Sequence, residues 1–275
     1  MSCEIVAEVG ASHRQSFDLA VSLIHNAANC GADAVKFSMF TADDMTLNLS
    51  VESQFQIKSG PWKGPLYSLY EKIAIPYDWI PKLKAIAESD DLKFIVGVYH
   101  PRTVPIALDM GIKHFKVASF EVGYLELLRA LKNEEVYVSL GSADLRQIET
   151  VATIPKVTLL KCTSDYPTNF EDLNLRTIPA LAHRFKRSVG LSDHSPGTLA
   201  PVIAVTFGAT VIEKHLQIDG GLDESFAMRP SEFFTMVQTV RAAEKALGKV
   251  EYGGRKSFHR KEVDGRMVRV VHNVE

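Results

Sequence analysis

Short runs of β-branched and apolar residues alternate along the chain with longer amphipathic stretches. Eight of the short runs predict β-strands, over Glu4–Val9, Ala34–Phe37, Phe94–Val98, His114–Ala118, Val136–Leu140, Val157–Cys162, Ser188–Leu191 and Thr210–Lys214. The longer stretches predict helices, over Phe17–Asn29, Pro76–Ser89, Val104–Met110, Leu125–Leu131, Leu145–Ala152, Leu175–Phe185, Leu199–Phe207 and Ser231–Leu247. This alternation favours a parallel sheet, and strands that are apolar along their whole length indicate burial of both faces.

Three units repeat the same turn from a helix into a strand, in residues 30–36, 110–116 and 207–214. Each unit has a glycine just past the helix end, as a helix C-cap requires, and each then ends its strand with a lysine. The chain has 275 residues, close to the roughly 250 of one eight-stranded barrel. We therefore predict a (β/α)8 TIM barrel over residues 1–247, followed by a tail or linker over 248–275.

Two segments depart from the alternation. Residues 41–75 form a long connection after the second strand, on the face where barrel enzymes hold their substrates, as either a substrate lid or a mobile surface loop. The tail 248–275 is polar and basic, with a single apolar run at Met267–Val271. Because it cannot build a core of its own, we expect it to be poorly ordered or docked on a neighbouring chain.

Composition and charge narrow the classes of function. The net charge of −2 and the pI near 6.5 argue against a broad nucleic-acid surface, which requires a basic excess. The three cysteines, Cys3, Cys30 and Cys162, lack metal-ligand spacing and are typical of a reducing cytoplasm. The N-terminus does not resemble a signal peptide, and no run approaches the ~20 apolar residues of a membrane span. We therefore expect a cytoplasmic protein whose partners are small molecules, not nucleic acid or membrane.

Two histidines end consecutive strands, in Ser-Val-Gly-Leu-Ser-Asp-His (188–194) and Thr-Val-Ile-Glu-Lys-His (210–215). Such strands are neighbours in a parallel barrel, so His194 and His215 should converge at its carboxyl-terminal mouth on one ion or one substrate. A lone histidine is more often structural, but this pair favours a site for Mn, Fe, Co or Zn over Ca. We expect Asp193 to orient an imidazole, and Asp223 to orient substrate or complete the metal shell.

Cations and hydroxyl groups gather near the same strand ends. The lysines are Lys36, Lys116, Lys161 and Lys214, and the hydroxyl residues are Ser38, Ser119, Ser139, Ser142, Thr163, Ser164 and Ser192. Because a buried charge is costly unless it meets a partner, this set predicts a pocket for phosphate and carboxylate groups. A structural salt bridge is the alternative for any one lysine. Glu8 ends the first strand and suits acid–base chemistry or substrate binding, unless it pairs with a rim lysine.

Six stretches carry a specific resemblance. They are Ala-Glu-Val-Gly-Ala-Ser-His (7–13), Gly-Ala-Asp-Ala-Val-Lys-Phe (31–37), Phe-Lys-Val-Ala-Ser (115–119), Lys-Cys-Thr-Ser-Asp-Tyr-Pro-Thr (161–168), Val-Gly-Leu-Ser-Asp-His-Ser (189–195) and Val-Ile-Glu-Lys-His (211–215). Together they resemble the N-acetylneuraminate (sialic acid) synthase family. The resemblance implies condensation of phosphoenolpyruvate with a sugar aldehyde, an N-acyl hexosamine such as N-acetylmannosamine or a related sugar. The products would be a nonulosonic or related 2-keto-3-deoxy acid and phosphate.

The resemblance also implies roles for individual residues. His194 and His215 match the ligands of a divalent metal, usually Mn2+ or Mg2+, with Co2+, Fe2+ or Zn2+ as alternatives. Glu8 matches a catalytic carboxylate near the metal and the substrate. The residues that match the phosphoenolpyruvate site are Lys36, Lys116, Ser119, Ser139, Ser192 and Lys214. The remaining substrate-binding candidates are Tyr166 and Asp223, which face the amino sugar, Ser164, at a position filled by Asn or Ser, and Ser38, where a rim Gln is usual.

Departures from the family pattern lie mostly on the sugar side and leave the acceptor open. The usual Asn-His-Asn-Gly is here Ser-His-Arg-Gln (12–15), Phe120 replaces a glycine, and Glu224 replaces a histidine. The family also carries a C-terminal antifreeze-like domain that closes over the partner's site, which implies a homodimer. The chain stops near the point where that domain would begin, so we expect that the domain is either naturally lost or removed.

Two other functions remain open. A Schiff-base aldolase would use Lys116 or Lys214 as its nucleophile and would need no metal. A non-catalytic barrel would act as a binding or scaffold subunit in polysaccharide assembly. Borohydride trapping with pyruvate, compared with phosphate release from phosphoenolpyruvate, separates the aldolase from the synthase, and the metal content of the purified protein bears on the scaffold.

Overall fold

The computed structural model describes residues 2–49, 55–59, 62–250 and 252. The expectation for the tail, with its apolar run Met267–Val271, falls almost entirely outside the described residues. None of the described helices is long and apolar enough to cross a membrane.

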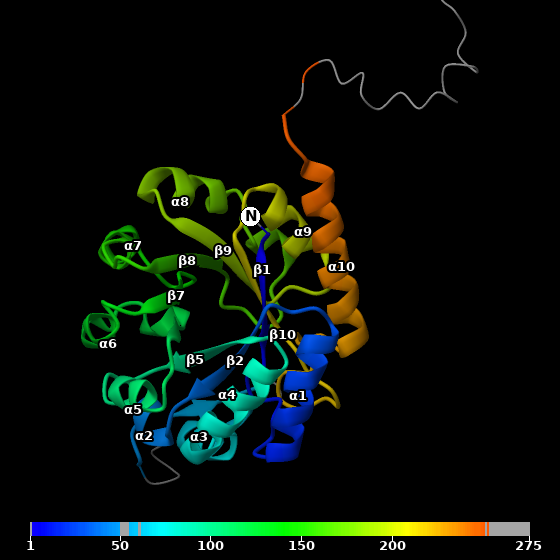
Figure 1. The fold of residues 1–275 in the computed structure, drawn as a ribbon. Coiled ribbons are helices and arrows are strands. Elements are labelled where there is room, and N and C mark those ends of the chain that lie inside the picture. The colour runs from blue at the N-terminus through cyan, green and yellow to red at the C-terminus, as the bar shows by residue number, and fades with distance from the viewer. Residues whose placement is uncertain (1, 50–54, 60–61, 251, 253–275) are drawn as a thin grey trace, which may run out of the picture.

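Eight parallel strands close into a barrel, as Figure 1 shows. They are β1 (Glu4–Glu8), β2 (Ala34–Met39), β5 (Lys93–Val98), β6 (His114–Val117), β7 (Glu135–Ser139), β8 (Val157–Cys162), β9 (Ser188–Asp193) and β10 (Val211–His215). Their order around the barrel is β1-β10-β9-β8-β7-β6-β5-β2. Closure comes from β1, which pairs with β2 on one side and with β10 on the other, where Glu8 lies opposite His215. The predicted TIM barrel is confirmed.

Helices surround the barrel in the order that the alternation predicts. They are α1 (Phe17–Asn29), α4 (Ile80–Ser89), α5 (Thr103–Asp109), α6 (Leu125–Ala130), α7 (Leu145–Ala152), α8 (Thr177–Phe185), α9 (Leu199–Thr206) and α10 (Pro230–Leu247). Local chemistry sets some of these bounds. The Ser16 side chain accepts a hydrogen bond from the Leu19 amide at the start of α1, and Asp144 forms a capping box with Gln147 at the start of α7.

The predicted helix Pro76–Ser89 is divided in two. A 3₁₀ turn over Tyr77–Trp79 precedes α4, in which a proline occupies the first turn. Proline lacks an amide hydrogen and is tolerated only where a helix begins, so α4 starts afresh there. Two further 3₁₀ turns cover Ser119–Glu121 and Phe170–Asp172.

The repeated glycine turn is also confirmed. Gly31, Gly111 and Gly208 have φ angles of +81°, +75° and +86°, a conformation that only glycine adopts without steric cost. Each of these glycines ends a helix and directs the chain into the next strand.

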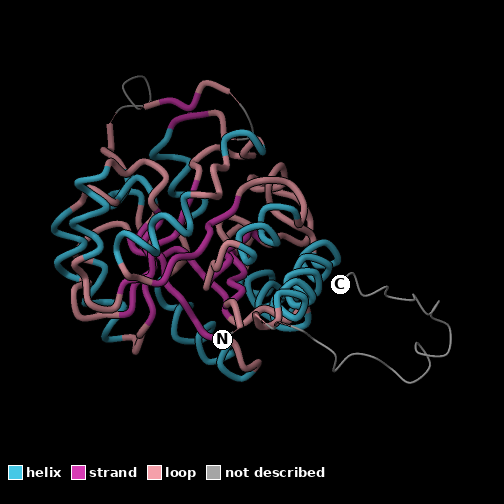
Figure 2. Tube along the Cα trace, turned by 90° about the horizontal axis from the view of Figure 1, so that it is seen from above, coloured by secondary structure: helices cyan, strands magenta, loops and turns pink. Residues whose placement is uncertain are grey.

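The connection over residues 41–75 contains elements that were not predicted. They are α2 (Ala42–Met45), β3 (Gln56–Ile57), β4 (Gly64–Pro65) and α3 (Leu66–Ile73). β3 and β4 pair in antiparallel fashion, and Figure 2 shows this pair apart from the barrel strands. α2, β3 and β4 are too short to produce a recognisable hydrophobic period, whereas α3 is as long as α7 and was missed.

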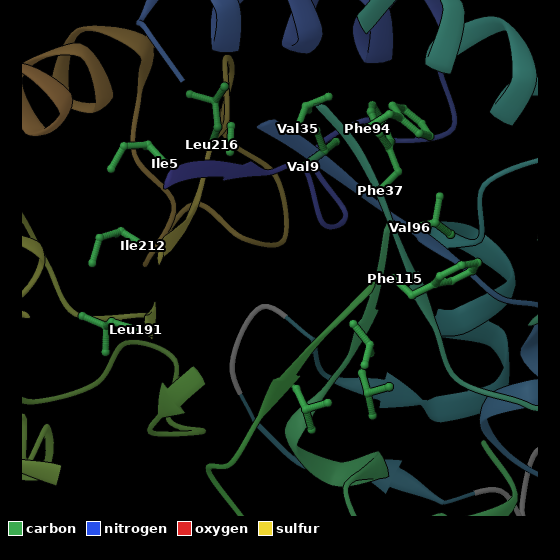
Figure 3. Packing of buried hydrophobic residues seen from close by; sticks show 14 of the residues in the cluster. Ile5, Val9, Val35, Phe37, Phe94, Val96, Phe115, Leu191, Ile212 and Leu216 are labelled. Atoms are coloured by element: carbon green, nitrogen blue, oxygen red, sulfur yellow. The ribbon is translucent and has the colours of Figure 1, made fainter. Parts of the chain in front are cut away.

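Strand alternation divides the core into two shells. Side chains of one parity, among them Phe37, Phe94 and Phe115, pack beneath the helices, and the rings of Phe37 and Phe94 stack with centroids 5.6 Å apart (Figure 3). Side chains of the other parity fill the barrel interior, where a second buried cluster comprises Val6, Ala34, Ile95, Tyr137, Leu160 and Val211. Interior side chains therefore fill the middle of the barrel and leave its carboxyl-terminal mouth for polar groups.

Candidate active site

A ring of four buried charges lies above the apolar cluster inside the barrel. Glu8, Lys36, Lys116 and Glu213 come from β1, β2, β6 and β10, and each is at most 6% exposed. The Lys36 ammonium lies 3.1 Å from both Glu8 and Glu213, and Lys116 lies 3.8 Å from Glu213. Because these contacts join strands that are not all neighbours, the ring crosses the barrel interior.

Burial and neighbouring charge shift the pKa values of this ring in opposite directions. Burial alone would lower the pKa of Lys36, but the carboxylates of Glu213 and Glu8 reverse this shift. Burial alone would raise the pKa of Glu213, but the ammonium groups of Lys116 and then Lys36 lower it. Burial dominates at the other two groups, so it raises the pKa of Glu8 and lowers that of Lys116.

Hydroxyl groups converge beside Lys116 at the ends of β6, β7 and β8. The Gly141 amide donates to Ser119 Oγ at 3.1 Å. A Cβ at Gly141 would lie 2.4 Å from Ser164 Oγ and 2.8 Å from Ser119 Oγ, so only glycine allows both hydroxyls to approach. The hydroxyls of Ser139 and Ser164 are buried and have no partner among the described residues. These are the donors that an anion beside Lys116 requires.

Ser38 and Ser192 already have partners. Ser192 donates to Glu213 at 2.8 Å, and Ser38 shares a hydrogen bond of 3.0 Å with the Tyr99 hydroxyl. Ser192 therefore belongs to the charged ring, whereas Ser38 lies on the wall of the cavity above it.

His194 and His215 lie side by side at the mouth, with ring centroids 5.5 Å apart. His194 Nδ1 lies 2.9 Å from the Thr163 carbonyl oxygen, and His215 Nδ1 lies 3.4 Å from Asp223 Oδ2. In metal-binding histidines one ring nitrogen faces an oxygen acceptor and the other binds the ion. His194 Nδ1 has such an acceptor, although the same ring also bonds Cys162, whereas His215 Nδ1 has no hydrogen-bond partner among the described residues. The Tyr166 ring packs on His194 at 4.1 Å between centroids.

Asp223 is held beside His215 by backbone geometry. Its Oδ2 accepts from the Ala11 amide at 3.0 Å, and its Oδ1 has no partner among the described residues. Gly10, with a φ of +51°, allows this approach, because a Cβ there would lie 2.4 Å from Asp223 Oδ2. The side chain that faces an imidazole is therefore Asp223, and the expectation that Asp193 does so is wrong.

Asp193 pairs instead with Lys214 on the outer side of the barrel wall. The Lys214 ammonium lies 2.6 Å from Asp193 Oδ2 and also donates to the Ser195 carbonyl oxygen, and both charged side chains are fully buried. Successive residues of a strand face opposite sides, so Lys214 points away from the interior that receives Glu213 and His215. The expectation that Lys214 contacts substrate is thus corrected. Lys161 shares the outward parity and donates to Thr163 Oγ1 and the Cys162 carbonyl oxygen.

A cavity of about 540 Å³ opens beside Glu8 and His215. Glu8, Ser38, Tyr166, His215 and Asp223 line its barrel side. The connection over residues 41–75 supplies another wall, with Met45, Ile57, Trp62, Tyr70 and Ile73. This segment therefore lies over the mouth, on the face where the sequence predicts it.

Three residues of the site were not anticipated: Glu213, Cys162 and Glu121. Cys162 forms a hydrogen bond with His194, which with Ser119 and Lys116 lowers the thiol pKa to about 7 although burial raises it. Glu121 lines the cavity, burial raises its pKa, and its Oε2 has no partner among the described residues. Alternation would have identified Glu213, which stands two positions before His215 and so shares its face.

The described side chains supply only some of the ligands that a divalent cation needs. In the described part of the chain, no group of three or more His, Cys, Asp or Glu side chains is arranged to hold an ion. The two oriented imidazoles nevertheless suit a transition metal, with the remaining positions left for substrate or solvent oxygens. The unpartnered Oδ1 of Asp223 adds a nearby acceptor.

Comparisons with known proteins give a consistent result. The model of the NeuB family matches residues 23–252. A pseudaminic acid synthase of Campylobacter jejuni is 39% identical over 256 residues, which cover 89% of this chain and 74% of that protein. An N,N'-diacetyllegionaminic acid synthase of Legionella pneumophila is 32% identical, with 91% and 75% covered. The crystal structure of N-acetylneuraminic acid (sialic acid) synthetase from Leptospira borgpetersenii superposes with a TM-score of 0.83 at 26% identity, covering 96% of this chain and 91% of that one.

The buried pair Lys214–Asp193 yields a prediction about stability. Replacing Lys214 by Met leaves an unpaired carboxylate without solvent, so the free energy of unfolding should fall by about 3–5 kcal/mol. Urea denaturation followed by circular dichroism measures this loss.

Lys161→Met is the matched control, because among the described residues this outward lysine of β8 bonds only neutral oxygens. Its cost should stay within about 1.5 kcal/mol. Equal losses of unfolding free energy in the two variants would show that the Lys214–Asp193 pair stabilises the fold no more than the hydrogen bonds of Lys161 do.

Proposed function

The chain belongs to the NeuB family of sialic-acid-synthase-like enzymes, and from that membership we propose that it condenses phosphoenolpyruvate with an N-acyl amino sugar aldehyde and releases phosphate. The observation that supports this most directly is the buried ring of two lysines and two carboxyl groups, placed beside unpartnered hydroxyls and two histidines. Donor, acceptor and cation sites would then share one barrel mouth.

The donor is proposed to bind against Lys116, Lys36 and the hydroxyls of Ser119, Ser139 and Ser164. Phosphoenolpyruvate carries phosphate and carboxylate charges, which compensate buried ammonium groups. Lys116 has its pKa lowered by burial, so it gains most from an added anion. The hydroxyls of Ser139 and Ser164 provide hydrogen bonds that no described protein group uses.

His194 and His215 would hold the cation, which we propose to be Mn2+ or Mg2+. When bound, such an ion would polarise the aldehyde oxygen as a Lewis acid. The Thr163 carbonyl accepts from His194 Nδ1 and orients that imidazole, while the Asp223 carboxylate lies beside His215. Tyr166 packs over His194 and limits access of water to that side.

Glu8 is proposed to move the proton. C3 of the donor forms a bond to the aldehyde carbon, and a water then adds to the cationic C2 and gives its proton to Glu8. The former aldehyde oxygen takes up this proton. The bond from C2 to the phosphate oxygen then breaks, and the C2 hydroxyl gives its proton to the departing phosphate and becomes the ketone oxygen. Burial raises the pKa of Glu8, which suits a group that must hold a proton transiently near neutral pH.

The acceptor is proposed to occupy the cavity between the histidines and α3. Its walls combine aromatic side chains, such as Trp62 and Tyr70, with a few polar groups, among them Asp223 and Glu121. Aromatic and methyl surfaces suit the acyl group of an amino sugar, and the carboxylates suit its hydroxyl or amide hydrogens.

A Schiff-base aldolase remains the second candidate, because the lowered pKa of Lys116 is also what an amine nucleophile needs. The two chemistries predict different products. A panel of N-acyl hexosamines and plain aldoses, each with phosphoenolpyruvate and Mn2+, should release phosphate with at least one N-acyl sugar. Borohydride treatment with pyruvate should leave Lys116 unmodified. A trapped adduct without phosphate release would favour the aldolase.

Replacement of Lys116 by Met should weaken phosphoenolpyruvate binding by about a hundredfold, because a charge-assisted contact is lost. Titration calorimetry measures the affinity. Lys161→Met is the control, since this lysine faces away from the site, and its affinity should match the wild type. Intact binding in Lys116→Met would remove this lysine from the donor site.

Donor affinity should also depend on pH. Because the pKa of Lys116 is lowered, its ammonium is lost at a lower pH than that of an ordinary lysine, and binding should weaken as the pH rises through this value. A bound anion raises that pKa again, so binding should take up protons. Calorimetry between about pH 7 and pH 10 in buffers of different ionisation enthalpy tests this. Lys116→Met should lose the proton uptake, and equal uptake in the variant would assign it to another group.

A further inference from the structure

The connection over residues 41–75 is attached to the barrel through the loop between β1 and α1. The side-chain amide of Gln15, in this loop, donates to the carbonyl oxygen of Glu71 at 2.7 Å and to that of Ala74 at 2.9 Å. These carbonyls belong to the last turn and the C-cap of α3. The last four carbonyls of a helix lack partners within it, so Gln15 caps α3 from a distant part of the chain.

A second side chain of the same loop reinforces this contact. His13 forms a hydrogen bond with the Ile73 backbone, and its Nδ1 accepts from the backbone amide of Gln15 at 3.1 Å. His13 is buried, whereas Gln15 is exposed. The two residues therefore bind three backbone groups in the last turn and C-cap of α3, and His13 also orients Gln15.

Two residues of this loop adopt an unfavourable backbone conformation. Arg14 and Gln15 have φ angles of +45° and +51°, a region that side chains other than Gly, Asn and Asp rarely occupy. Residues held in such conformations persist where the surrounding structure gains from them. Here the gain is the position of the Gln15 amide, which faces the end of α3.

The same loop and the same helix both form the cavity. Gly10 and Ala11, at the start of the loop, line it and hold Asp223 beside His215, while Tyr70 and Ile73 of α3 line another wall. Ala11 and Ile73 belong to one buried cluster. A change in how the loop holds α3 would thus alter the width of the acceptor space without touching the donor site.

We propose that Gln15 is a positioning residue for the acceptor: its amide fixes the end of α3, and through Tyr70 and Ile73 it sets the geometry of the acceptor wall. This role rests on the proposed function, because it concerns the acceptor of that reaction. Gln15 lines no part of the cavity itself among the contacts described.

Gln15→Glu is the sharpest test, because it keeps the shape and replaces a donor of two hydrogens by an acceptor that faces two carbonyl oxygens. The KM for the N-acyl sugar should rise about tenfold, while kcat and the Kd for phosphoenolpyruvate stay within about twofold. Amide hydrogen exchange in residues 66–74 should quicken about tenfold. Gln15→Ala should change the same quantities in the same direction by a smaller factor.

Asn26→Asp is the matched control. The Asn26 amide also donates to a backbone carbonyl, that of Ser22 at 2.8 Å, but it does so on α1 and far from α3 in sequence. This variant should leave the acceptor KM and the exchange of residues 66–74 unchanged.

The outcomes separate the two proposals. A wild-type protein that releases no phosphate with any sugar overturns the proposed function and the role of Gln15 with it. An active wild type whose acceptor KM is unchanged in both Gln15 variants overturns the role of Gln15 alone. Parallel rises in the acceptor KM and the donor Kd would show a general structural effect and would likewise overturn it.

Discussion

The two-residue alternation of strands in a closed barrel is the constraint on which the site depends. Each strand gives one set of side chains to the helices and the other to the interior, and closure fixes which interior residues meet. Glu213 and His215 enter the interior from one strand, while Lys214 between them is directed outward to Asp193. Charges of opposite sign therefore meet across the barrel at Lys36, although their strands are not adjacent.

The four buried charges of the ring serve the proposed function more than they serve the stability of the fold. Ionised groups removed from water cost several kcal/mol each, and apolar residues of similar volume would often stabilise the fold as well or better. The interior shows both solutions, because Val6, Ile95 and Leu160 fill its middle while the fully buried charges gather at the mouth and the half-buried pair Glu4–Lys93 lies at the opposite end. Such a distribution is expected where a ligand binds to the charged groups and supplies interactions that the protein itself does not.

The parts of the fold that could be predicted are those with a strong local signal. The bounds of Phe17–Asn29 and Leu145–Ala152 agree with the structure because capping residues precede both helices. α2, β3 and β4 were not predicted, because two to four residues carry no period. The convergence of His194 and His215 followed from strand order, whereas the roles given to Lys214 and Asp193 failed because alternation was not applied within the strand. The partnership of His215 with Asp223 depends on a loop closure that one sequence does not reveal.

The outward pair Lys214–Asp193 joins β9 to β10 immediately behind the two histidines. Each member is the chain neighbour of one histidine, so the pair fixes the separation of the two strand ends from the rear. The pair therefore holds the two imidazoles at their spacing, and little conformational entropy would be lost on binding of the proposed cation. A fixed spacing would also set an upper and a lower limit on the size of the ion that fits between the two imidazoles, because the strand ends would have to move to accept a larger or a smaller one. A buried ion pair that no ligand can reach would thus determine which ions fit the proposed site.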